Sequence, residues 1–189
     1  RRHTRCSRWS RGLGDVYKRQ LSSLTFDELR ARFPLIPSLR ELVEEFGGHT
    51  HLMLEIKAEH YPQPARQKAI LQATLSGLEA GNDYHWLLLD PSLATRVDFV
   101  AREFAFLVAE FNVSRLSREA LKRGFGGLTG HYLLLNRTLK QRHERAGQRI
   151  GTGFIHSRNA LFRELNRGVE WIFSNRAVRI QRILDALLD

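Results

Sequence analysis

The stretch Ile36–Lys57 reads IPSLRELVEEFGGHTHLMLEIK and joins a short amphipathic segment to a strand pattern. Its last six residues, Leu52 to Lys57, alternate between apolar and other side chains with the period of two that is typical of a strand. One face is wholly apolar, and the opposite face carries Met53, Glu55 and Lys57. A strand with one wholly apolar face is expected to pack against another layer of the protein.

Glu55 and Lys57 are the best candidates for chemistry in this chain. Buried Glu and Lys side chains are rare unless they are paired, bind a ligand or hold a metal. The flanking apolar residues favour burial of this pair. The alternative is a strand at the edge of a sheet, whose polar face is in contact with water.

Strand and helix patterns alternate from this stretch to the end of the chain. Before the first expected strand, Thr25 and Ser38 are expected to cap two short helices over residues 24–29 and 39–46. The expected strands cover residues 52–57, 84–89, 106–111, 131–135, 149–155 and 168–173. The helices expected between and after them cover residues 65–80, 91–102, 114–122, 136–146, 157–165 and 175–188.

This alternation predicts an α/β fold with a parallel sheet. A doubly wound sheet usually carries a glycine-rich phosphate turn after an early strand, and none is present here. A TIM (β/α)₈ barrel fits better, although only about six of its eight strand–helix units are found. We therefore expect an incomplete barrel that contains strands three to eight.

Residues 1–20 form a strongly basic leader with seven Lys or Arg and one acid, so 7 − 1 = +6 of the formal net charge of +10 lies there. The leader has no apolar periodicity and resembles a translated adaptor sequence at the end of an open reading frame. We expect residues 1–20 to be non-native or disordered and residues 21–189 to form the domain. The alternative is a natural basic arm that binds phosphate backbones or acidic membranes.

The composition of the remaining chain limits its chemistry. Its only cysteine, Cys6, lies in the leader, so the domain has no disulfide and no thiolate metal site, which favours the cytoplasm without proving it. No apolar run approaches the ~20 residues of a membrane span. The basic run at residues 137–149 has no interleaved aromatic residues for base stacking, so we expect a solvated helix and no nucleic acid.

Three motifs carry a resemblance to a known family: Ile-Pro-Ser-Leu-x-Glu-Leu from Ile36, Leu-Glu-Ile-Lys from Leu54, and Arg-Gly-Val-Glu-Trp-Ile-Phe-Ser-Asn from Arg167. Together they resemble the glycerophosphodiester phosphodiesterase family, over about residues 24–185. Membership would imply a metal-dependent TIM barrel that hydrolyses glycerophosphodiesters to an alcohol and glycerol 3-phosphate. By the same resemblance, Glu55 is a ligand of a divalent cation, Ca²⁺ or Mg²⁺, and Lys57 binds the substrate phosphate.

The chain also departs from the family pattern. The His-Arg-Gly histidine, the second catalytic histidine and the Glu-x-Asp metal pair are missing after residue 20. We therefore expect no catalytic residue in this chain, an incomplete metal site and an inactive fragment of a phosphoric diester hydrolase. The alternative is a non-catalytic barrel or a basic module that binds anions or nucleic acid.

Five further residues are candidates for lining the substrate pocket: His60, His156 and Arg158, which follow or end predicted strands, and Phe154 and Trp171, which the resemblance places in the seventh and eighth strand motifs of the family. For the loop histidines, a position without any function is the simpler alternative. An incomplete barrel also leaves two open strand edges, which invite self-association. We expect the chain to aggregate, to dimerise through these edges, or to collapse so that the two edges approach each other.

Overall fold

The computed structural model describes residues 24–59 and 61–188. The predicted leader, residues 1–20, and the candidate pocket residue His60 lie outside these described residues. Contacts divide the chain into two compact units, with the boundary after Glu45. None of the helices in the described ranges is long and apolar enough to span a membrane.

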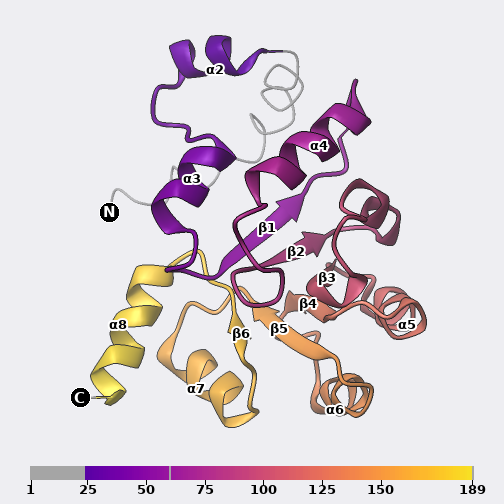
Figure 1. Cartoon of the computed structure of the whole chain (residues 1–189). Helices are drawn as coiled ribbons and strands as arrows, with labels where there is room; N and C mark the ends of the chain where they lie inside the picture. The colour runs from indigo at the N-terminus through magenta and orange to yellow at the C-terminus, as the bar shows by residue number, and fades with distance from the viewer. Residues whose placement is uncertain (1–23, 60, 189) are drawn as a thin grey trace. The chain divides into compact units, whose positions relative to one another are not determined.

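The second unit is built on a single sheet of six parallel strands (Figure 1). Each strand is hydrogen-bonded to the strand that precedes it in the sequence, so the order is β1-β2-β3-β4-β5-β6. The strands are β1 (Leu52–Ile56), β2 (Tyr84–Leu88), β3 (Ala105–Ala109), β4 (Gly127–His131), β5 (Arg149–Gly153) and β6 (Trp171–Ile172).

This strand order identifies the architecture. In a doubly wound sheet the order reverses at a switch point, whereas in a barrel each new strand is added on the same side of the last. Here the order never reverses, and Figure 1 shows the strands along an arc from β1 to β6 with α4 to α7 on its outer side. The sheet is therefore an incomplete TIM barrel of six units, as the sequence predicts.

Helices or 3₁₀ turns follow every strand. Helix α5 packs on β3 and β4, and α6 packs on β5, as the crossovers of a barrel do. The helical elements are α2 (Phe26–Arg32), α3 (Leu39–Phe46), α4 (Pro64–Thr74), η1 (Pro91–Arg96), η2 (Arg102–Phe104), α5 (Val113–Arg123), α6 (Arg137–Arg145), α7 (Arg158–Asn166) and α8 (Ala177–Leu188).

The two short helices that precede the sheet begin as predicted. Thr25 accepts a hydrogen bond from the backbone N–H of Glu28, whose carboxylate accepts one from the N–H of Thr25 at 2.8 Å. Ser38 and Glu41 make the same reciprocal pair, with 3.2 Å and 2.7 Å bonds. The backbone N–H of Ser38 is the main reason why the pKa of Glu41 falls to about 2.

The fourth predicted strand is wrong in its position. The expected strand covers residues 131–135, but β4 covers Gly127–His131, and His131 ends the strand. Glycine gives a weak strand signal, yet it is needed here: a Cβ on Gly127 would lie 1.9 Å from the carbonyl oxygen of Arg149 in β5. The close approach of β4 and β5 therefore requires glycine, and glycine does not give the apolar alternation from which a strand is predicted.

The helix predicted over residues 91–102 is also wrong. Two 3₁₀ turns, η1 and η2, stand in its place, with Asp90 as the N-cap of η1. The ring of Phe99 makes an edge contact with Trp86, 6.3 Å between centroids, and Val97 is buried. These two side chains between the turns pack toward the sheet, which a continuous helix over the same residues would not require.

A cluster of rings joins the two edges of the sheet near the amino ends of the strands. His51, just before β1, lies 4.8 Å from the ring of Trp171 in β6. His85 in β2 lies 5.6 Å from the same ring. The first and last strands thus approach each other at this end, which is one of the three outcomes that the open edges predict. Aggregation and dimerisation remain predictions.

Hydrogen bonds link the two histidines of this cluster. His51 Nδ1–H donates to the carbonyl oxygen of Asn82 at 2.7 Å, and His51 Nε2 shares a 2.8 Å hydrogen bond with His85 Nδ1. His85 is 4% exposed, and burial, with smaller contributions from His51 and Arg149, lowers its pKa to about 4. His85 is therefore neutral in the folded protein near pH 7.

Acid is expected to destabilise the fold through His85. In the unfolded chain its pKa returns to about 6.5, so the unfolded state binds more protons between pH 6.5 and pH 4. The free energy of unfolding should be greatest above pH 6.5 and should fall by roughly 3 kcal/mol as the pH falls to 4. Burial also lowers the pKa of His143, which adds a loss of the same sign.

Urea denaturation at pH 4 to 8 measures this effect. The His85→Phe variant keeps an aromatic ring but does not titrate, so its stability should depend less on pH than that of the unmodified chain. The matched control His49→Phe changes an exposed histidine and should leave the dependence as it was. Equal pH dependence in all three proteins would show that His85 is not responsible.

Candidate functional site

The carboxyl ends of the six parallel strands lie at one edge of the sheet, which we call the carboxyl edge. Active sites of barrels of this type are found at this edge, in the loops that follow the strands. Glu55 and Lys57 reach it from β1, and His131 reaches it from β4. Phe154 and His156 follow β5. Most of the sequence-predicted candidates therefore share one edge of the fold.

Glu55 and Lys57 form an ion pair, in which Lys57 Nζ donates to Glu55 Oε1. The period-two spacing explains the pair, because residues two apart in a strand project from the same face. Glu55 is in register with Leu87 of β2, two residues after His85, so the pair projects from the concave face that also holds His85. The sequence thus predicts correctly that these two charges lie together.

Their predicted burial is wrong. The side chain of Glu55 is 34% exposed and that of Lys57 is 50% exposed. The cause is the position of β1, which is an edge strand of the described sheet and has a neighbour, β2, on one side only. The pair therefore fits the alternative interpretation, in which the strand lies at the edge of a sheet and its polar face is in contact with water.

Neighbouring groups fix the backbone at this end of β1. Arg96 Nη1 donates to the carbonyl oxygen of Lys57 at 2.8 Å, and its guanidinium lies 4.5 Å from the centroid of the Tyr61 ring.

Asp90, which follows β2, does not add a free carboxylate. It accepts a 2.9 Å hydrogen bond from the N–H of Ser92, and this bond is the main reason why its pKa is lowered.

A stack of rings occupies the other half of the carboxyl edge. Phe154 is 58% exposed and lies over His131, with 5.1 Å between ring centroids and an angle of 23°. His131 is in turn stacked on Tyr132 at 4.9 Å. Phe154 has a φ of 65°, which is unusual for a residue with a side chain. Its carbonyl accepts a 2.8 Å hydrogen bond from His156 Nδ1–H.

His131 and Tyr132 are members of this edge that the sequence does not predict. The fourth strand is expected at residues 131–135, four residues later than β4, so both residues fall at its start and not at the carboxyl edge. The run Gly126–Gly130, with Leu128 and Thr129 between glycines, is the signal that could have placed the strand correctly.

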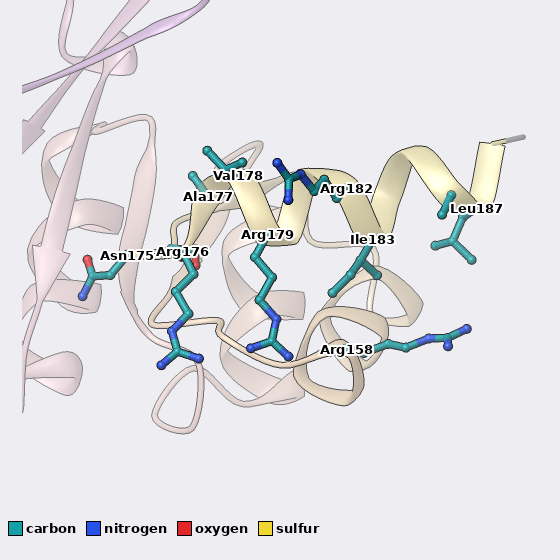
Figure 2. A pocket seen from close by; sticks show the side chains of 11 residues that line it. Arg158, Asn175, Arg176, Ala177, Val178, Arg179, Arg182, Ile183 and Leu187 are labelled. Carbon is teal, nitrogen blue, oxygen red and sulfur yellow. Dashed lines mark hydrogen bonds between the residues drawn. The ribbon is translucent and has the colours of Figure 1, made fainter. Parts of the chain in front are cut away.

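Two candidate pocket residues lie apart from this edge group. Trp171 is near the amino ends of the strands, packed against His51 and His85. Arg158 begins α7, with its guanidinium 5.1 Å from the ring of Phe162, and lines a pocket formed with α8 (Figure 2). The structure therefore brings Glu55 together with Lys57, and Phe154 with His156.

The donor set for a metal is incomplete in the part of the chain that the structure describes. Within residues 24–59 and 61–188, no three His, Cys, Asp or Glu side chains gather in a way that could hold an ion. A Ca²⁺ or Mg²⁺ ion requires about six or more oxygen ligands, of which Glu55 would supply one or two. The described residues alone do not fit a divalent cation.

Comparison with solved structures identifies the fold. A protein from Silicibacter pomeroyi, assigned as a glycerophosphoryl diester phosphodiesterase, superposes with a TM-score of 0.71 over 87% of this chain, at 18% identity. A protein from Agrobacterium tumefaciens with the same assignment gives 0.64 over 81%, at 14% identity. The chain has the fold of the glycerophosphodiester phosphodiesterases. An Oleispira antarctica phosphodiesterase, solved in complex with the product sn-glycerol-3-phosphate, gives 0.59 over 77%, at 16% identity.

The match covers only part of each of these proteins. The chain spans 69% of the Silicibacter protein, 66% of the Agrobacterium protein and 58% of the Oleispira protein. No protein-family model matches the sequence, and no curated protein matches it. The likeness to the phosphodiesterases is thus one of fold, at identities of 14–18% for these three.

Proposed function

We propose that this chain supplies one side of the active site of a glycerophosphodiester phosphodiesterase. The observation that carries the proposal is the Glu55–Lys57 ion pair at the carboxyl end of a strand, in a fold shared with phosphodiesterases of this class. The reaction would convert a glycerophosphodiester and water to an alcohol and glycerol 3-phosphate.

The two residues have distinct roles in this proposal. Lys57 places a positive charge where it can bind a phosphoryl oxygen of the substrate. Glu55 would be one ligand of a Ca²⁺ or Mg²⁺ ion, which supplies charge stabilisation to the phosphate when it is bound. In the absence of a bound cation, the carboxylate of Glu55 orients the ammonium group of Lys57. Phe154 and His156 would line the mouth of the same site.

The 189-residue chain is expected to have no phosphodiesterase activity by itself. One carboxylate and one lysine cannot replace a site with several metal ligands and an acid–base pair of histidines. The measurement is the release of glycerol 3-phosphate from glycerophosphocholine, with added Mg²⁺ or Ca²⁺. Turnover that depends on the metal and persists in Glu55→Gln would show that the active site lies elsewhere on the chain.

A further inference from the structure

A second site is suggested by a pocket that does not involve Glu55 or Lys57. It lies along α8, has a volume of about 920 Å³ and includes Arg158 from the start of α7 (Figure 2). Its lining is Arg158, Ser174, Asn175, Arg176, Ala177, Val178, Arg179, Arg182, Ile183, Ala186 and Leu187.

The charge of this lining is entirely positive. Four of its eleven residues are arginines and none is an acid. Within the described ranges, none of the four arginines lies within 4.0 Å of a carboxylate oxygen. Six other arginines do make such contacts: Arg30, Arg115, Arg123, Arg149, Arg163 and Arg167. Asp185, the one acid in the described part of α8, instead accepts a 2.8 Å hydrogen bond from Gln181.

The walls of the pocket are held by the core. Ile183 packs against the buried cluster of Ile155, Leu161 and Ile180, which anchors α8 to α7 and to the loop after β5. Ser174 fixes the loop before α8: its hydroxyl donates to the carbonyl of Ile155 and accepts from the N–H of Arg176. The arginines therefore extend from a supported backbone.

The arginines are not evenly distributed around α8. Figure 2 shows the side chains of Arg176 and Arg179 leaving the helix on the same side as Ile183 and Leu187, the side on which Arg158 lies. Arg182 lies on the other side of the helix, with Val178. The guanidinium groups of Arg176 and Arg179 thus lie on the same side as the apolar Ile183 and Leu187, and that of Arg158 extends toward the Leu187 end (Figure 2). This arrangement suits a ligand with an anionic group and an organic part.

We propose that this pocket binds a phosphate group carried by a soluble ester or by a lipid head group. Guanidinium groups bind phosphate oxygens in pairs of parallel hydrogen bonds, and arginine is preferred over lysine where such planar recognition is needed. The pocket is larger than a phosphate ion alone, so the rest of the ligand has room against Ile183 and Leu187. This site is separate from the Glu55–Lys57 pair and goes beyond the proposed function.

Two binding measurements at 150 mM salt test the site. Calorimetric titration with inorganic phosphate tests the soluble source, and co-sedimentation with vesicles of phosphatidylcholine with or without phosphatidic acid tests the lipid source. The Arg176→Gln/Arg179→Gln variant should bind at least about tenfold more weakly than the unmodified chain. The control Arg137→Gln/Arg145→Gln removes the same charge from exposed positions of α6 and should retain binding.

Each outcome decides the question. Binding of inorganic phosphate that is lost only in the pocket variant supports a soluble ligand, and binding only to phosphatidic acid vesicles, lost in the same variant, supports a lipid ligand. Equal losses in both variants would overturn the site, because general charge would then explain the binding. Failure of both probes to bind would also overturn it. In a Lys57→Met background the Arg176→Gln/Arg179→Gln change should cause the same fold loss of binding, which separates this pocket from the proposed active site.

Discussion

Glu55→Gln is expected to lower kcat for glycerophosphocholine by about 100-fold or more, in a form of the protein that also carries the catalytic histidines and the Glu-x-Asp pair. Glutamine has nearly the same size but no charge, so the substitution removes an anionic ligand from the cation without removing packing volume. The affinity for Ca²⁺ or Mg²⁺ should fall with it. Steady-state kinetics and metal titration measure the two effects.

A matched control is available at the same edge of the sheet. Glu110 is exposed and follows β3, so Glu110→Gln removes a carboxylate from the carboxyl edge without touching β1. Its kcat and metal affinity should stay within about twofold of the unmodified values, as for a surface charge with no ligand role. Unchanged metal affinity in Glu55→Gln would refute the assignment of Glu55 as a metal ligand.

The largest expected effect on stability is at Glu164, whose side chain is completely buried in α7. Its carboxylate accepts a 2.9 Å hydrogen bond from Arg163 and a 2.7 Å bond from Arg167. Arg167, only 18% exposed, also donates to the carbonyl of Leu135. Glu164→Ala leaves Arg167 without its counter-ion and should lower the free energy of unfolding by about 3 kcal/mol.

A second ion pair serves as the control for this prediction. Glu170 pairs with Arg149, and both side chains are exposed, at 67% and 54%. Glu170→Ala should therefore change the free energy of unfolding by less than about 0.5 kcal/mol. Urea denaturation measures both variants, and losses of similar size would mean that burial of Glu164 does not set the strength of its interactions.

The periodicity of the chain was sufficient to predict the parallel sheet, since five of the six predicted strands overlap the observed ones in their middle residues. It failed at β4, where contact between neighbouring backbones requires glycine and so removes the apolar alternation on which the prediction depends. It also failed at residues 91–102, where Val97 and Phe99 pack toward the sheet between two 3₁₀ turns.

The candidate site was predictable where its parts are close in sequence. Glu55 and Lys57 are two residues apart on one strand, and the alternation alone places them together. The stack of His131 and Phe154 joins the ends of β4 and β5, and its prediction needs the correct register of both strands. The arginine pocket joins α7 and α8, and no local pattern indicates which helical arginines lack an acidic neighbour in space.

The central claim is that the Glu55–Lys57 end of β1 receives the phosphate of a glycerophosphodiester. Titration of the ¹⁵N-labelled chain with sn-glycerol 3-phosphate, followed by amide chemical shifts, tests it most directly. We predict shifts at Ile56 to Ala58 that are lost in Lys57→Met and retained in Lys122→Met, which changes an exposed lysine on α5. Shifts confined to the α8 pocket, or shifts at β1 that persist in Lys57→Met, would contradict the account.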